Sequence, residues 1–182
     1  MSNTYKSVLS IVLVAAFVSS IMGVSYSYMT SNLSGEEVAS TIILNDGKIV
    51  TTYTNNDKNI EINNISPSKD AIISKKFAVS GTNNGDSNMD YQVYLKTDNN
   101  TFNDNSLTCS IVGRSLTKNQ MMIDANNLVI PKKGELNLGT GSFKGKDNAI
   151  HEYEINIYYK NKGNNKDKNS YIGQIIVRSD EV

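Results

Sequence analysis

The sequence predicts an all-β fold, an antiparallel sandwich of two sheets preceded by one apolar N-terminal helix. Three observations predict it. Short runs of alternating apolar and polar residues recur along the chain, turn-forming Asn, Asp and Gly residues separate them, and a long uncharged stretch stands ahead of them. Alternation with a period of two places one face of a strand on a core, and each apolar face must meet another. We expect about 8–9 strands, as in immunoglobulin-like or jelly-roll-like sandwiches.

The N-terminal stretch differs in kind from the rest of the chain. No charged residue occurs from Ser7 to Gly35, and a helix needs about 20 apolar residues to cross the hydrocarbon of a bilayer. Lys6 precedes the stretch and Glu36 and Glu37 follow it, which places the N-terminus in the cytoplasm by the positive-inside tendency. Residues 1–35 are therefore predicted to be a signal or transmembrane anchor segment with a short linker, and residues 36–182 an extracellular sandwich domain.

Two fates of this segment remain open. Its apolar part is long and only Lys6 is basic, which favours a retained anchor and a single-pass protein of the cell membrane with an extracellular C-terminal domain. Small residues around Ser25-Tyr26-Ser27 are candidates for a signal-peptidase site, because such sites carry small residues just before the cut. Cleavage there would make the protein secreted, or part of an extracellular matrix.

The body of the chain is a succession of strand candidates. Asp46-Gly47, a hairpin-type dipeptide, joins the first two. The clearest alternation spans 89–96, where Tyr91 and Val93 share the apolar face. The strand candidates, in chain order, are 40–45, 48–54, 60–65, 75–81, 89–96, 107–112, 128–131, 135–139, 151–160 and 171–178.

Two further expectations concern connections within this body. Residues 151–160 and 171–178 alternate in the same way and flank a loop rich in Asn and Lys, so we expect them to form a long-looped antiparallel hairpin. Residues 115–127 contain Leu116, Met121, Met122 and Ile123. This is the one place beyond the N-terminal segment where we expect a helical turn.

Composition limits the classes of partner and the forces that hold the fold. Lys+Arg and Asp+Glu both number 18, so the net charge is zero and nothing attracts the chain to nucleic acid in general. Cys109 is the single cysteine, which excludes an intramolecular disulfide and leaves the fold to rest on its core. No motif for a small-molecule substrate stands out.

The residue types that carry hydrolytic chemistry are scarce. Zincin catalysis needs two His on one helix with a Glu between them, whereas His151 is the only histidine and lies on a strand candidate. On a strand, Glu152 and Glu154 point to the face opposite His151. Cys109 as a nucleophile would need His151 as its base. We therefore expect His151 to be a partly buried sheet residue and Cys109 a small buried hydrophobe.

Two loops carry many side-chain oxygens of the type that calcium prefers. They span 98–106, with Asp98 and Asp104, and 163–170. Neither has the spacing of an EF-hand, and Lys166 and Lys168 would repel a cation in the second. We expect solvated loops that join strands. The sequence thus predicts no catalytic, cofactor-binding or metal-binding residue, no cofactor, and a protein that is not an enzyme.

The order of several short motifs resembles a known family. These motifs are the apolar segment running into GVSYSYMT, the turn Ser66-Pro67-Ser68, a strand with Phe77 and Val79, a strand with Tyr91 and Val93, and the 151–178 region. Together they resemble the exported β-sandwich proteins of Gram-positive bacteria related to the matrix protein TasA and to camelysin, which carry a SipW-type signal segment. The resemblance covers nearly the whole chain, although an Ala-x-Ala cleavage motif is lacking.

The resemblance implies a structural protein of the cell surface or of a biofilm matrix. In some relatives an N-terminal strand passes from one subunit to the next to build a fibre. Here the donor would be Glu37 to Asn45, freed only by cleavage. The implied partners are the membrane, through the N-terminal helix, and further copies of the chain. An adhesin or ligand-binding module using its Asn-rich loops is the alternative, and metalloprotease-like activity, as ascribed to camelysin, is a remote one.

Overall fold

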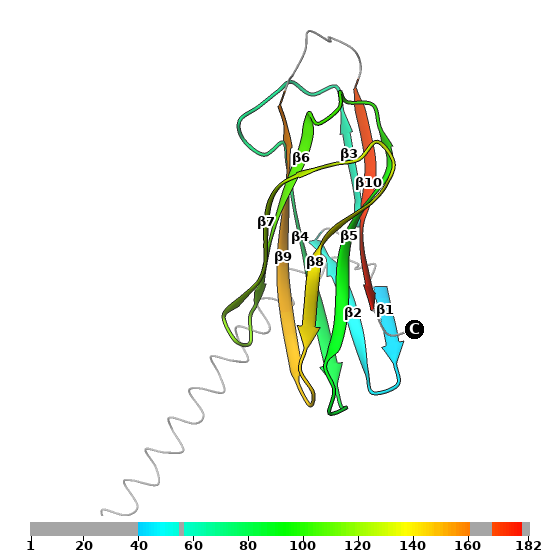
Figure 1. The fold of residues 1–182 in the computed structure, drawn as a ribbon, viewed down its shortest axis with the longest axis vertical. Coiled ribbons are helices and arrows are strands. Elements are labelled where there is room, and N and C mark those ends of the chain that lie inside the picture. The colour runs from blue at the N-terminus through cyan, green and yellow to red at the C-terminus, as the bar shows by residue number, and fades with distance from the viewer. Residues whose placement is uncertain (1–39, 55–56, 161–168, 180–182) are drawn as a thin grey trace, which may run out of the picture. The chain divides into compact units, whose positions relative to one another are not determined.

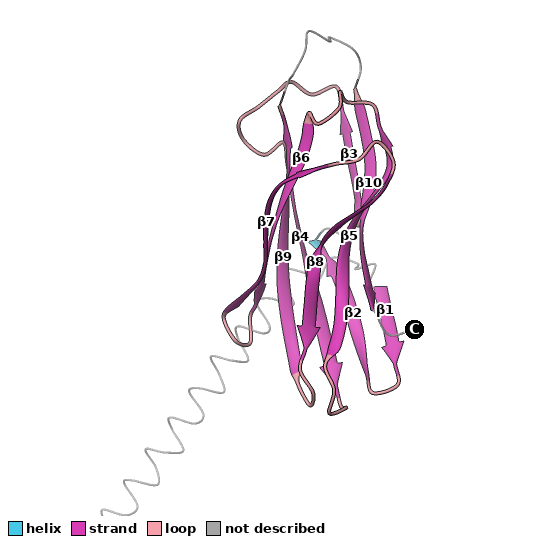
Figure 2. Cartoon of the chain, in the orientation of Figure 1, coloured by secondary structure: helices cyan, strands magenta, loops and turns pink. Residues whose placement is uncertain are grey.

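The computed structural model describes residues 40–54, 57–160 and 169–179 of the chain. This part consists of strands joined by turns and loops (Figure 1, Figure 2). In chain order the strands are β1 (Ser40–Leu44), β2 (Gly47–Tyr53), β3 (Asn59–Asn63), β4 (Ile73–Asn83), β5 (Met89–Asn100), β6 (Leu107–Ser115), β7 (Gln120–Val129), β8 (Gly134–Phe143), β9 (Asn148–Tyr159) and β10 (Ser170–Ser179).

The strands form two antiparallel sheets, which confirms the predicted all-β sandwich, although the described residues contain ten strands where about 8–9 were expected. The six-stranded sheet has the order β1-β2-β4-β9-β6-β7, and the four-stranded sheet has the order β3-β10-β5-β8. The predicted hairpin at Asp46-Gly47 is confirmed, because β1 and β2 pair from Leu44 opposite Gly47 outward. The expected N-terminal helix and the boundary after residue 35 lie outside the described residues.

The core lies between the two sheets and is built from the inward-facing residues of nearly every strand. In β5 and β9 the buried positions alternate with half-buried or exposed ones along most of their length, as the period of two requires. Tyr53 of β2 also donates a hydrogen bond of 3.2 Å to the carbonyl of Ile175 in β10, which links the two sheets. Burial of apolar surface on this scale replaces the disulfides that the chain does not have.

Two aromatic rings of the core lie over glycines of the neighbouring strand. Gly113 is opposite Tyr153 in the β6–β9 ladder, and Gly141 is opposite Tyr91 in the β5–β8 ladder. A Cβ atom added at Gly113 would lie 2.1 Å from Tyr153 Cε1, and one at Gly141 would lie 2.2 Å from Tyr91 Cζ. The absent side chains therefore give these rings their space.

The predicted hairpin of residues 151–178 is wrong. β9 pairs with β4 and β6 in one sheet, whereas β10 pairs with β3 and β5 in the other. Both strands do bury one face, as their alternation indicates. Because both sheets bury their inner faces in the same core, alternation does not distinguish a partner in the same sheet from one in the facing sheet.

The helical turn expected within 115–127 is also wrong. Residues 116–119 form a turn and β7 follows as the edge strand of the six-stranded sheet. The β6–β7 register shifts twice, between Cys109 and Ile111 and between Gly113 and Arg114. Each shift inserts an extra residue in β7, as a β-bulge does. These insertions break the period of two and give the apolar residues of β7 an irregular spacing.

A buried asparagine ties together the loops at one end of the sandwich. Asn83 is 3% exposed, and its Nδ2 donates to the carbonyls of Ser87, Phe143 and Lys144 at 2.8, 3.2 and 3.3 Å. Its Oδ1 accepts a hydrogen bond of 3.1 Å from the backbone N–H of Gly85. One side chain thus holds the β4–β5 loop against the end of β8.

Replacement of this side chain by Asn83→Ala is expected to lower the free energy of unfolding by about 2–3 kcal/mol, because it leaves buried backbone groups without partners. Urea unfolding of the variant and of the unchanged chain measures the difference. Asn84→Ala is the matched control, since Asn84 is exposed and exposed substitutions usually change stability by less than about 0.5 kcal/mol. Equal losses in the two variants would contradict the assignment.

Candidate functional site

The single histidine lies in the core rather than at a surface cleft. His151 is 3% exposed on β9, and its Nδ1 lies 2.6 Å from the hydroxyl of Tyr91, which lies 2.6 Å from the hydroxyl of Tyr153. The imidazole also stacks on Phe143, with ring centroids 4.4 Å apart. Glu152 is exposed on the opposite side of the strand. His151 is thus a sheet residue, as predicted, but it is fully buried and not partly buried as expected.

The surroundings of His151 favour its neutral form. Burial lowers the pKa of His151 from its ordinary 6.5 to about 4. Asp147 and Lys118 have smaller effects that oppose each other, since Asp147 raises this pKa and Lys118 lowers it. Burial likewise raises the pKa of the Tyr153 hydroxyl to about 12. These groups therefore stay uncharged across the neutral range and act as packing and hydrogen-bonding elements of the core.

The cysteine and the histidine are far apart. Cys109 is fully buried on β6, where it pairs with Ile157, whereas His151 pairs with Ser115 at the other end of the same ladder. The two positions are six residues apart along β9, which is about 20 Å along a strand. Burial raises the pKa of the Cys109 thiol to about 12. The prediction of a small buried hydrophobe is confirmed, and the single histidine lies too far from this thiol to act as its base.

The two candidate calcium ligands each contact a lysine. Asp98 lies in β5, 3.5 Å from Lys96 Nζ, and Asp104 lies 3.3 Å from Lys132 Nζ. Within the described part of the chain, no three His, Cys, Asp or Glu side chains come together in a group that could hold a metal ion. Most of the second oxygen-rich loop, residues 161–168, lies outside the described residues.

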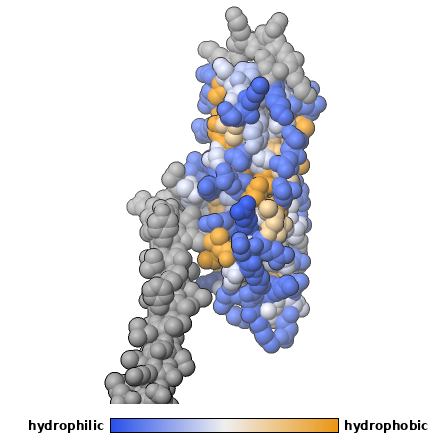
Figure 3. Space-filling view, turned by 90° about the vertical axis from the view of Figure 1, so that its left-hand side faces the viewer, coloured by the Kyte–Doolittle hydropathy of each residue, from blue (hydrophilic) through white to orange (hydrophobic). Residues whose placement is uncertain are grey.

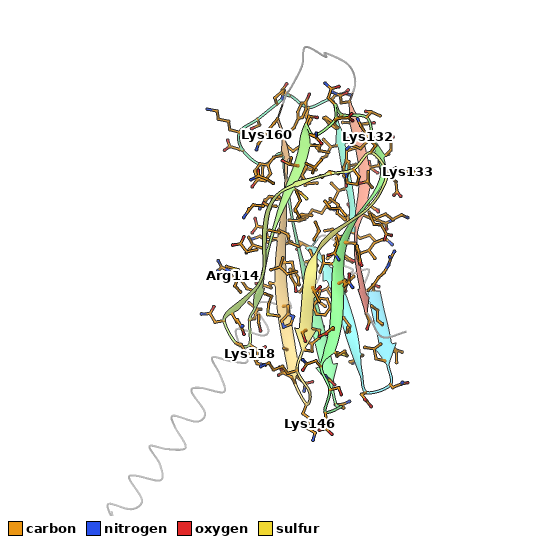
Figure 4. The ribbon with its side chains drawn as sticks, viewed as in Figure 1. Arg114, Lys118, Lys132, Lys133, Lys146 and Lys160 are labelled. Atoms are coloured by element: carbon orange, nitrogen blue, oxygen red, sulfur yellow. The ribbon has the colours of Figure 1, made fainter. Side chains whose placement is uncertain are left out.

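The cationic side chains are distributed over the surface, and half of those in the described part of the chain form ion pairs. Figure 4 shows Lys118 and Lys146 toward one end of the sandwich and Lys132 and Lys160 toward the other. Lys118 contacts Asp147, and Lys146 lies 2.6 Å from Asp86. The positive charges therefore do not form a single unpaired patch.

The sheet edges are the remaining feature with a chemistry of its own. An edge strand presents unpaired backbone N–H and C=O groups to which another strand can add. This sandwich has four edge strands: β1 and β7 in the six-stranded sheet, and β3 and β8 in the four-stranded sheet. Natural sheets protect their edges with bulges, charges, very short strands or covering segments.

Strands β7 and β8 are protected by irregularity and by each other. β7 carries its two bulges and a left-handed residue, Asn127. The β5–β8 register shifts between Val93 and Tyr94, and Gly139 of β8 has a φ of 146°. A Cβ at Gly139 would lie 2.8 Å from Ile123 of β7, so the two strands touch where their sheets end. Neither edge is flat and open.

Strand β3 is protected by charge. It has five residues with the exposed Glu61 at its centre. Lys75 Nζ lies at the start of the strand, where it donates to the carbonyl of Asp57 at 2.8 Å and contacts the carbonyl of Asn59. A strand approaching this edge would have to displace the lysine and face the carboxylate.

Strand β1 is as short as β3, but it has neither a bulge nor a charged residue. All five of its residues pair with β2 without a register shift, and its sequence, STIIL, has no charge and no proline. Ile42 and Leu44 pack partly against the core, while Ile43 is 82% exposed. Figure 1 shows β1 beside β2 at the margin of the sheet. Figure 3 shows another face of the sandwich, where hydrophilic residues dominate and apolar residues form separate spots.

The contrast between the edges was missed by sequence reasoning. The uncharged STIIL run was visible in the sequence, but whether a strand lies at an edge depends on its neighbours in space. Only the absence of charge over five strand residues, set against Glu61 in 60–65, was a usable signal.

Comparison with known proteins identifies no family for this chain. No family model matches it, and no curated protein sequence matches it. Among solved structures, an arabinose-bound α-L-arabinofuranosidase aligns over 76% of this chain and 22% of its own length, with 9% identity and a TM-score of 0.22. Likeness at that level carries neither fold nor activity. Among the described residues, no helix is long and apolar enough to cross a bilayer.

Proposed function

We propose that the chain is a non-enzymatic structural protein of the cell exterior, either anchored in the membrane by its N-terminal segment or released as the subunit of a fibre. The observation that carries the proposal is the place of β1. The segment implied as a donor by the resemblance, residues 37–45, coincides over Ser40–Leu44 with an edge strand that pairs with β2 and with no second strand of the described part. A strand so placed can leave one subunit and pair with another.

The cost of releasing β1 is small compared with that of an interior strand. Its exposed residues contribute little to the core, and only Ile42 and Leu44 are partly buried. Partial burial of two such side chains contributes about 2–4 kcal/mol, to which the five paired residues of the β1–β2 ladder add a modest amount. An equivalent strand from a second subunit would restore both contributions.

The use of the reactive residues supports the non-enzymatic part of the proposal. His151 contacts Tyr91 and Phe143 in the core, and Cys109 is fully buried at the other end of the ladder. Both side chains therefore pack in the core, and His151 also forms a hydrogen bond there. The remote metalloprotease alternative would need the imidazole to leave the core before it could bind a metal.

Mass spectrometry of the mature N-terminus, with electron microscopy of negatively stained material from cell surface and medium, tests the proposal. An uncut chain in the membrane fraction supports the anchored form, and a chain cut ahead of residue 37 with visible fibres supports the released form. A chain found only in the cytoplasm would overturn the proposal.

A disulfide between β1 and β2 is expected to prevent fibre growth. Thr41 and Val50 are directly opposite each other, so the pair Thr41→Cys and Val50→Cys can bridge the strands and hold β1 in its own sheet. Microscopy of the oxidised protein should show subunits without fibres, and a reductant should restore them. Thr41→Cys alone is the control. Fibres from the locked protein at the control's rate would exclude strand donation.

A further inference from the structure

We propose that β1, while it remains in its own sheet, pairs edge to edge with β1 of a second copy, so that two six-stranded sheets become one continuous antiparallel sheet. The inference rests on the proposed structural role and extends it by naming a partner for β1, which among the described edge strands is the one that is both regular and uncharged. It differs from strand donation because neither copy gives up its strand.

The argument begins with the difference between β1 and the other edges. Bulges interrupt β7 and β8. The edge at β3 carries the charge of Glu61 and, at its start, the Lys75 side chain. β1 is regular, uncharged and rich in Thr and Ile, the residue types that strands favour. A regular, uncharged edge of this kind is a template for another strand, and in both properties it differs from the other three edges.

A second copy is the partner that fits this edge best. The strand carries no charge, so a charged foreign strand gains no selective contact, and two identical strands meet without repulsion. Antiparallel pairing of identical strands generates a two-fold axis, the commonest closed symmetry of protein assemblies. The pairing satisfies the outward N–H and C=O groups of both copies at once.

The faces of the sheet fix the register. Residues opposite each other in an antiparallel pair point to the same face. Both inner faces therefore stay on their cores only if each pair joins two even-numbered or two odd-numbered residues of β1. With Ile42 opposite Ile42 of the second copy, Ile43 lies opposite Thr41 of that copy on the outer face. This register pairs all five residues of β1 and covers part of the 82%-exposed Ile43.

The outer face next to β1 is compatible with this junction. Thr41, Val50, Ser80 and Ile150 form one row across β1, β2, β4 and β9. No member of this row is charged. With Thr41 opposite Ile43 of the second copy, the row continues into Ile43, Lys48, Thr82 and Asn148 of that copy, so no like charges meet along it. Lys48, opposite Ile43 in β2, lies one strand away from the junction.

The pairing is expected to be weak in dilute solution. Five residues from each copy bury less than the roughly 1,200 Å² at which stable protein interfaces begin. Confinement of many copies at one surface raises their effective concentration toward the millimolar range. The junction therefore suits a protein that is held at high density and not one that dimerises at low concentration.

The first test measures self-association of the full chain in detergent by sedimentation equilibrium. Ile43→Lys is expected to raise the dissociation constant of the dimer at least about tenfold, since it places two lysines at the junction. Ile172→Lys is the matched control, because Ile172 is also exposed and lies in the other sheet. A dimer unaffected by Ile43→Lys, or a control with the same effect, would overturn the proposal.

The second test traps the register. A mixture of Thr41→Cys and Ile43→Cys chains should form a mixed disulfide under mild oxidation in higher yield than either variant alone, and buried Cys109 should not react. Absence of any cross-link overturns the pairing. The locked pair Thr41→Cys and Val50→Cys should still dimerise; loss of the dimer on locking would show strand exchange in place of edge pairing. Neither result depends on where the protein is localised, so failure of edge pairing can be distinguished from failure of the proposed exterior role.

Discussion

Acidification from pH 6.5 to pH 4 is expected to lower the free energy of unfolding by about 3 kcal/mol through His151 alone. Burial holds the pKa of His151 at about 4 in the folded chain, against 6.5 when exposed, and each unit of difference corresponds to about 1.36 kcal/mol. Between pH 6.5 and pH 4 the imidazole of His151 becomes protonated in the unfolded chain but stays neutral in the folded chain. The stability that the neutral imidazole supports is therefore complete above pH 6.5 and is lost as the pH falls toward 4.

Urea unfolding at a series of pH values isolates this effect, because the chain has a single histidine. Hydrogen bonds from the Asn59 backbone and from Lys75 lower the pKa of the Asp57 carboxyl, and a hydrogen bond from Arg178 lowers that of Glu135. These carboxylates therefore act in a more acidic window. The slope between pH 6.5 and pH 5 thus belongs to His151. His151→Gln should remove that slope whatever its absolute stability, and a flat profile for the unchanged chain would refute a buried neutral imidazole.

The strands were predictable because period-two alternation is a local property. In β5 and β9 each residue's face follows from its neighbours in sequence. The same reasoning placed His151 and Cys109 inside, since both share the apolar phase of their strands. The pairing of β9 and β10 was not predictable, because the choice between two sheets that share one core is made by contacts distant in sequence.

The edge formed by β1 was more difficult to predict from the sequence than the core. The regular pairing of β1, the bulges of β7 and the position of Lys75 over β3 are all relations between strands. Bulges are also difficult to recognise in a sequence, because the inserted residue interrupts the alternation that identifies a strand. The extra residues of β7 are the reason that 115–127 resembled a helical turn.

Removal of the Tyr91 ring is expected to cost more stability than any other single change considered for this chain, about 3–5 kcal/mol for Tyr91→Ala. Tyr91 is fully buried, stacks on Phe143 with centroids 5.2 Å apart, and meets the edge of Tyr153. Tyr91→Phe keeps the ring but removes the hydroxyl shared by His151 and Tyr153. We expect that variant to lose about 1–3 kcal/mol, because a buried polar group is left without its partner.

The neighbouring Gly141 provides a control that separates lost packing from general damage. Gly141→Ala alone should destabilise the chain by about 1–3 kcal/mol through overpacking, since its Cβ would lie 2.2 Å from Tyr91 Cζ. In the Tyr91→Ala background the same methyl group enters the vacated space and should be neutral or stabilising. The two substitutions are therefore expected to be non-additive in urea unfolding. Simple additivity would show that the Tyr91 ring does not occupy the space above Gly141.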